Sequence, residues 1–124
     1  MTDILIVEDE PAILESLQFI LTRDGWTVDT ARDGETAIQS VWRLKPRMLL
    51  LDIMLPKKGG LEVLKTIRSH SAFKDTPVVV LTARGQQYDR QLAMELKADG
   101  FITKPYANSE VIAEVRRMLA VNHA

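Results

Sequence analysis

Short apolar runs alternate along the chain with longer segments whose apolar residues recur at helical spacing. Runs such as Ile4–Val7 and Met48–Leu51 contain no polar position, which is typical of parallel strands that are buried on both faces. Strands are predicted at residues 4–7, 26–31, 48–51, 78–81 and 101–103. Because a helical segment follows each strand, the pattern predicts an α/β fold, with five parallel strands in one sheet and five helices on its two faces.

The predicted helices begin and end at residues that favour helix ends. Pro11 suits the first turn of the first helix, and Gly25 can take the left-handed conformation that closes it. Gly34 opens the second helix, Pro46 stops it, and the fourth helix is expected after Gly85. No linker or repeat interrupts the alternation, so residues 1–124 are predicted to form one domain.

Composition and charge narrow the class of protein. A formal net charge of −1 gives no general attraction to nucleic acid or to anionic membranes. The chain has no cysteine, which excludes disulfides and thiolate metal sites. The N-terminus lacks the pattern of a secretion signal, and no apolar run approaches membrane-spanning length. We therefore expect a cytoplasmic protein.

Polar side chains occur where the predicted strands end. Asp52 directly follows the third strand, Glu8 and Asp9 follow the first, Thr82 follows the fourth and Lys104 follows the fifth. The carboxyl ends of parallel strands lie at one edge of the sheet, where α/β folds bind their ligands. Asp52 taken alone would more simply be a helix cap or a solvated acid. The joint occurrence of these residues favours a shared site.

The residue types at this edge fit phosphoryl transfer. Three carboxylates held close together repel one another unless a cation lies between them, and oxygen ligands favour Mg²⁺. The ammonium of Lys104 could bind a phosphoryl oxygen, and the hydroxyl of Thr82 could donate a hydrogen bond to another. Asp52 could then act as the nucleophile and become an aspartyl phosphate.

Four segments carry a resemblance to a known family. Residues 6–10, 51–56, 80–84 and 102–105 read IVEDE, LDIMLP, VLTAR and ITKP. In these motifs and in their order the chain resembles the receiver domains of two-component response regulators, the CheY-like superfamily, over residues 3–121. The resemblance implies a flavodoxin-like doubly wound fold with strand order 2-1-3-4-5. It also implies a signalling domain that takes part in its own phosphoryl transfer and dephosphorylation, not an enzyme.

The resemblance assigns a role to each residue of the site. Asp52 would be the phosphoacceptor, with Thr82 and Lys104 acting on the phosphoryl group. Mg²⁺ would be held by Glu8, Asp9, Asp52 and the backbone carbonyl of Met54.

The family's conformational switch has its counterparts here as well. Phe101 would be the aromatic residue that turns inward when Thr82 moves, and the small Ala83 would leave space for it. The Lys104–Pro105 peptide is a candidate for the cis form. Bulky Met54 and Arg84 are expected to shield the acyl phosphate and slow its hydrolysis.

The implied partners are proteins. A sensor histidine kinase or a phosphotransfer protein would supply the phosphoryl group from a phosphohistidine. A downstream effector would read the surface of the fourth helix, last strand and fifth helix. No direct contact with nucleic acid or membrane is expected. Family members often dimerise through charged pairs on this surface, but Gly100 stands where many of them have an acid, which leaves a phosphorylation-dependent homodimer open.

Other readings stay open. The chain could be a stand-alone regulator or a receiver cut from a DNA-binding transcriptional regulator; the polar end 122–124 slightly favours a natural terminus, without an output domain. A small aspartyl-phosphate phosphohydrolase would usually carry an acid where Met54 stands. A flavin carrier would need a phosphate-binding loop after the first strand, which the sequence lacks. A scaffold that signals without phosphate would not need the complete acid, threonine and lysine set.

Overall fold

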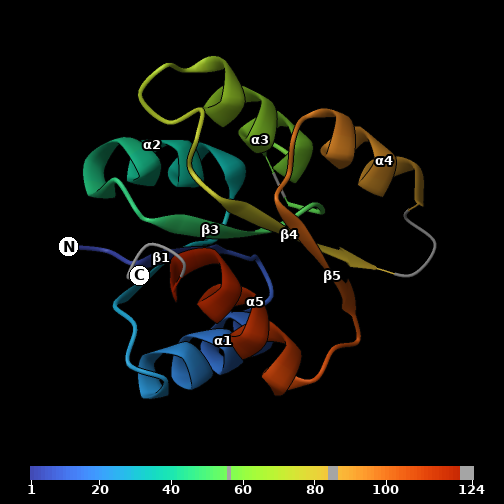
Figure 1. The fold of residues 1–124 in the computed structure, drawn as a ribbon. Coiled ribbons are helices and arrows are strands. Elements are labelled where there is room, and N and C mark those ends of the chain that lie inside the picture. The colour runs from blue at the N-terminus through green and yellow to red at the C-terminus, as the bar shows by residue number, and fades with distance from the viewer. Residues whose placement is uncertain (56, 84–86, 121–124) are drawn as a thin grey trace.

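In the computed structural model, which describes residues 1–55, 57–83 and 87–120, strands and helices alternate strictly along the chain (Figure 1). The strands are β1 (Ile4–Val7), β2 (Val28–Ala31), β3 (Met48–Asp52), β4 (Val78–Ala83) and β5 (Gly100–Lys104). The helices are α1 (Pro11–Arg23), α2 (Gly34–Leu44), α3 (Gly60–Ser69), α4 (Gln87–Glu95) and α5 (Asn108–Ala120).

All five strands pair in parallel, in the order β2-β1-β3-β4-β5. This confirms the predicted α/β fold and its strand order. The order reverses beside β1, so β1 and β3 are neighbours although β2 lies between them in sequence. A crevice at the carboxyl ends of β1 and β3 is the expected ligand position in such a sheet.

The sheet separates two layers of apolar side chains. Helices α2, α3 and α4 cover one face, and α1 and α5 cover the other (Figure 1). Successive strand residues point to opposite faces, so neighbours such as Leu50 and Leu51 belong to different layers. Both are fully buried. The sheet is therefore held rigidly from both sides, and its carboxyl edge is a fixed platform for polar side chains.

The strands differ slightly in length from the prediction. β2 begins at Val28 and not at Trp26, because the amide of Trp26 still donates to the carbonyl of Leu21 in α1 and the amide of Thr27 donates to the side chain of Asp3. β3, β4 and β5 run through Asp52, Ala83 and Lys104, beyond the apolar runs. Ladder pairing uses backbone groups only, so it continues through polar side chains that the sequence pattern places outside the strands.

The helix ends largely follow the sequence signals. Gly25 has a φ of 100° just past α1, and the side chain of Asp33 accepts from the Thr36 amide to cap α2. Lys45 ends α2 in the left-handed conformation, with a φ of 47°. Gly85 lies outside the described residues. None of the helices in the described part of the chain is both long and apolar enough to cross a membrane.

Candidate functional site

Asp52 is the last residue of β3, and its side chain lies inside the protein. Only 4% of the residue is exposed. Its Oδ1 accepts a hydrogen bond of 3.1 Å from the backbone amide of Met54, two residues later. The strand behind it is fully buried and paired on both sides, so the carboxylate is held in a fixed position at the carboxyl edge.

A glycine lets the chain after Asp52 return closely to the strand. The Gly60 amide donates to the carbonyl of Ile53 at 3.0 Å, where α3 begins. A Cβ at Gly60 would lie 2.3 Å from the backbone oxygen of Asp52, which is far inside van der Waals contact. The absence of a side chain at this position therefore sets the path of the loop beside Asp52.

Two more acids follow β1 and face the same edge. Glu8 is fully buried, and its Oε2 accepts from the amides of Asp9 at 3.0 Å and of Glu10 at 3.2 Å. One oxygen each from Glu8, Asp9 and Asp52 lies within 4.8 Å of the others. Within the described ranges this is the only acidic group of that kind. The structure thus brings together the three predicted acids.

Lys104 joins two of the acids. Its Nζ lies 3.1 Å from Oε1 of Glu8 and 3.2 Å from Oδ2 of Asp52. Lys104 is the last residue of β5, and the peptide bond to Pro105 is cis. The ammonium therefore reaches across from the edge strand to the centre of the sheet, spanning β4 between them.

Burial and mutual charge set the electrostatics of the site. Burial raises the pKa of the Glu8 carboxyl, and its hydrogen bond with Asp52 and the charge of Asp52 raise it further. Burial alone would lower the pKa of Lys104, but hydrogen bonds and attraction from Glu8 and Asp52 outweigh it, so that pKa is raised. Three carboxylates against one ammonium leave the cluster short of positive charge.

The predicted switch residues lie beside this cluster. Thr82, next to last in β4, is buried and pairs in register with Thr103, while Ala83 pairs with Lys104 and is exposed. Phe101 lies farther back on β5 and is half-buried against the α2–α3–α4 layer. The sheet thus places Thr82 and Lys104 at neighbouring strand ends, with Phe101 on the strand that carries Lys104.

Met54, two residues after Asp52, points its side chain toward solvent. Its side chain is 61% exposed beside the carboxylate that its amide binds. The role of its carbonyl as a metal ligand stays a prediction. Arg84, predicted to shield the phosphate from the other side, lies outside the described residues, as does Pro56 of the motif that follows Asp52.

Two neighbours of the site escaped the sequence analysis. The reason for glycine at position 60 is a close approach to the backbone of Asp52, which no local sequence pattern reveals. Tyr106 is half-buried, and burial raises the pKa of its phenol, with Lys104, Glu8 and Asp52 acting on it through their charges. In the sequence, its place directly after the Lys104–Pro105 pair was the signal that could have identified Tyr106 as a neighbour of the site.

The chemistry of the donor set suits a hard divalent cation. The group offers carboxylate oxygens only, and these hold a net negative charge that a divalent ion would neutralise. Every buried polar side-chain atom in the described part of the chain has a hydrogen-bond partner, so the acids are already ordered. The residues present therefore fit a metal site.

A family model described as the response regulator receiver domain matches residues 4–116. The chain belongs to this family. The receiver domain is 42% identical, over 116 residues, to the alkaline phosphatase synthesis transcriptional regulatory protein PhoP of Bacillus subtilis (strain 168). The match covers 94% of this chain and 48% of that protein. The chain spans about half the length of the curated relatives it matches.

Solved structures agree with the family. The receiver domain of NtrX from Brucella abortus superposes with a TM-score of 0.88 at 31% identity, covering 95% of this chain and 98% of that one. The receiver domain of sensor histidine kinase PA1611 from Pseudomonas aeruginosa PAO1 has a TM-score of 0.88 at 27% identity, covering 96% and 98%. That structure is described with a magnesium ion coordinated in the active site cleft. The predicted membership of the receiver family is thus confirmed.

Proposed function

We propose that this receiver domain is a phosphorylation-activated switch whose phosphoacceptor is Asp52. The observation that carries the proposal is the position of the Asp52 carboxylate. The Met54 amide donates to one of its oxygens, and the Lys104 ammonium lies 3.2 Å from the other. A nucleophile fixed in this way, beside a cation that can receive a phosphoryl oxygen, is suited to in-line phosphoryl transfer.

The phosphodonor would be the phosphohistidine of a sensor histidine kinase or of a phosphotransfer protein. An oxygen of Asp52 attacks phosphorus, the phosphorus–nitrogen bond to the donor's imidazole breaks, and the ring nitrogen leaves with the bonding electron pair and takes up a proton. Lys104 stays charged throughout and offsets charge on the phosphoryl oxygens. We place this exchange in the cytoplasm, the setting expected from the sequence.

Mg²⁺ is the proposed cofactor. Glu8, Asp9 and Asp52, with the carbonyl of Met54, would hold it, in line with the clustering of the three carboxylates. When bound, the ion supplies the positive charge that Lys104 alone cannot. Without the ion, the negative charges of Glu8 and Asp9 would repel an incoming phosphoryl group. The transfer reaction therefore requires the metal.

Phosphorylation would shift the domain between two states. A phosphoryl group adds about two negative charges at the carboxyl edge of the sheet. Those charges favour a state in which Thr82 moves toward the phosphate and Phe101 turns inward past Ala83. An effector protein would then read the changed surface of α4, β5 and α5. Direct contact of this chain with nucleic acid is not part of the proposal.

A homodimer on the same surface remains one outcome of phosphorylation. Several charged residues of the surface already pair within the chain. Arg117 pairs with Glu114 at 2.9 Å, and Arg68 pairs with Asp99 at 2.8 Å. A Cβ at Gly100 would lie 2.5 Å from Oε2 of Glu114. The carboxylate of Glu114 on α5 thus occupies the space that an acidic side chain at position 100 would need.

The test is incubation with acetyl phosphate and Mg²⁺, read by intact mass and by size-exclusion chromatography. We expect a gain of one phosphoryl group in the wild type and none in Asp52→Ala. The exposed acid Asp75 provides the control, because Asp75→Asn should gain the group as the wild type does.

A gain that persists in Asp52→Ala, or no gain in the wild type, would overturn the proposal. Turnover of a phosphomonoester at an Asp52-dependent rate would point to a phosphohydrolase instead. A change in elution volume that accompanies the mass gain would assign the homodimer to the phosphorylated state.

A further inference from the structure

Helix α4 buries few of its side chains. Of its nine residues, all of which the structure describes, only Ala93 is buried. Tyr88 and Met94 are large apolar side chains that lie mostly in solvent. The helices α1, α2 and α3 each bury three or more residues. Core packing therefore contributes less to the position of α4 than to the positions of these helices, and polar contacts contribute more.

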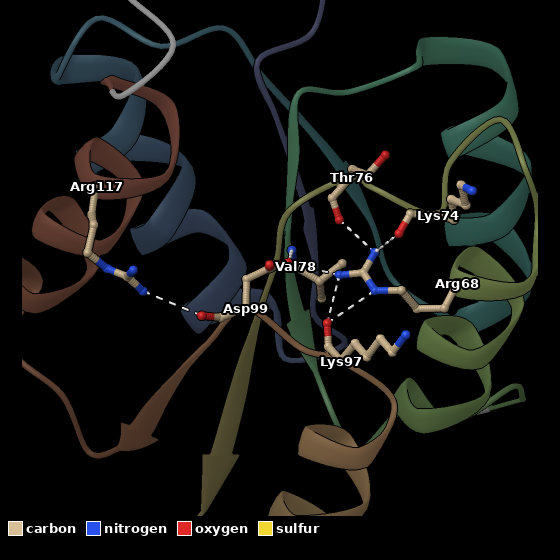
Figure 2. Close-up of polar contacts among 7 residues, drawn as sticks. All are labelled: Arg68, Lys74, Thr76, Val78, Lys97, Asp99 and Arg117. Carbon is tan, nitrogen blue, oxygen red and sulfur yellow. Dashed lines mark hydrogen bonds and ion pairs between the residues drawn. The ribbon is translucent and has the colours of Figure 1, made fainter.

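The C-terminal end of α4 is tied down by Arg68, the next-to-last residue of α3 (Figure 2). Nε and one terminal nitrogen of Arg68 donate to the carbonyl of Lys97, two residues past the helix, at 3.1 and 3.0 Å. The same terminal nitrogen pairs with Oδ2 of Asp99 at 2.8 Å. Lys97 has a φ of 68°, so the chain turns sharply at the point that Arg68 holds.

Arg68 is itself anchored to the loop before β4. Its other terminal nitrogen donates to the carbonyls of Lys74 at 3.1 Å and Thr76 at 2.7 Å. Oδ2 of Asp99 also accepts from the amide of Val78, the first residue of β4. The Arg68 side chain is only 12% exposed. One guanidinium thus joins α3, the start of β4 and the turn after α4, far from the acidic edge. We call these contacts the Arg68 clamp.

Among the described residues, the contacts of the N-terminal half of α4 are weaker. Arg90 lies over the ring of Phe101 on β5, with 4.8 Å from Cζ to the ring centroid. Arg90 is exposed, and a cation–π contact in water is weak compared with the several charge-assisted hydrogen bonds that the guanidinium of Arg68 donates. Helix α4 begins four residues after Ala83, which pairs with Lys104 at the acidic edge. The loosely held end of α4 is therefore the end nearer Asp52.

We infer that Arg68 is a positioning residue whose clamp makes the C-terminal end of α4 a fixed pivot, about which the N-terminal half turns when Asp52 is phosphorylated. The inference rests on the proposed function. The unequal anchoring decides which end moves, because the end with the weaker contacts is displaced at the lower free-energy cost. Turning of Phe101 removes the ring under Arg90, so the same event releases the N-terminal contact.

Hydrogen exchange measured by mass spectrometry tests the pivot, with acetyl phosphate and Mg²⁺ as the probe. The amides of Leu96, Lys97 and Ala98 donate into the last turn of α4 and report on its fixed end. In the wild type, phosphorylation should change exchange in residues 87–92 by about tenfold and leave 96–98 within about twofold. The intact mass of the same sample shows whether Asp52 carries the phosphoryl group.

Variants separate the pivot from a general effect on stability. In Arg68→Ala, exchange at 96–98 should rise by about tenfold, and phosphorylation should now change both ends of α4. Arg68→Lys should not rescue, because one ammonium cannot reach acceptors on three segments. Arg116→Ala is the control, since it breaks an exposed pair with Asp24 on the α1 and α5 side and should leave α4 unchanged.

Each outcome has one meaning. A mass gain accompanied by equal changes at both ends of α4 in the wild type would overturn the pivot alone. A phosphorylation response in Arg68→Ala identical to that of the wild type would do the same. Absence of the mass gain would overturn the proposed function and the pivot with it. The wild-type comparison needs no substitution, so it stands even where Arg68→Ala does not fold.

Discussion

Among single residues, Glu8 shows most directly how a residue of the candidate site can lower the stability of the folded protein. It is fully buried beside Asp52, and burial raises its pKa above the ordinary value of 4.5. The folded protein therefore binds this proton more tightly than the unfolded chain does. The stabilising contribution is complete below pH 4.5 and is lost as the pH rises through the raised pKa. As the pH rises above 4.5 without metal, the buried Glu8 carboxyl group therefore costs stability.

Replacing Glu8 by its neutral isostere should stabilise the metal-free protein. We expect Glu8→Gln to unfold at higher urea concentration at pH 7, by on the order of 1 kcal/mol in unfolding free energy. The gain should shrink as the pH falls toward 4.5, where the wild-type side chain also becomes neutral. Urea titrations in EDTA across this range measure it. Glu15→Gln, at an exposed site on α1, should show no such trend, and a gain independent of pH would contradict the explanation.

Among the elements, the loop from β3 to α3 controls the geometry at Asp52. Gly60 begins α3 against the backbone of Asp52, whereas its neighbour Gly59 has open space around a Cβ and an ordinary φ of −64°. The two adjacent glycines thus differ in their tolerance of a side chain. Only one of them is needed for the close approach of loop and strand.

Alanine at the two positions should therefore act differently. Gly60→Ala should lower the unfolding free energy by about 1–3 kcal/mol, the usual range for overpacking, and should slow phosphorylation of Asp52. Gly59→Ala should change neither by much, since nothing lies within 4 Å of the added carbon. Thermal unfolding and the rate of mass gain with acetyl phosphate provide the comparison. Equal behaviour of the two variants would refute this account of the loop.

The elements were also the level at which sequence was most informative. Unbroken apolar runs identify β3 and β4, and the polar residues that end them, Asp52 and Thr82, follow from the same pattern. The Arg68 clamp could not be read in this way. Two of its partners, Lys97 and Asp99, lie 29 and 31 residues away, and most of its acceptors are backbone carbonyls with no residue preference. Contacts of that kind depend on how loops pack after the sheet forms.

On the scale of the whole molecule, metal binding and folding should be linked. The carboxylates of Glu8, Asp9 and Asp52 come from two strand ends that meet only in the folded sheet. A cation that binds this cluster binds the native state and stabilises it by mass action. The unfolding free energy of the whole domain should therefore depend on whether a cation occupies the acidic cluster.

We expect Mg²⁺ at about one hundred times its dissociation constant to raise the unfolding free energy by about 2.7 kcal/mol. Thermal unfolding with and without EDTA measures the change. Asp9→Asn should abolish most of the increase while folding normally, because Asp9 is only partly buried. Asp75→Asn, which removes an exposed acid elsewhere, should respond to Mg²⁺ as the wild type does. An equal response of Asp9→Asn would contradict the assigned site.

The acidic cluster and the Arg68 clamp lie at opposite ends of the parallel strands, and this separation matters for protein engineering. Glu8→Gln at the carboxyl end is expected to stabilise the metal-free protein at the expense of the proposed metal site. Stabilising substitutions near Arg47 and Asp3, which form an ion pair of 3.2 Å at the amino end, would replace no residue of the acidic cluster. Heat resistance can therefore be raised through pairs at the amino end that belong neither to the acidic cluster nor to the Arg68 clamp, a practical advantage for building sensors on this scaffold.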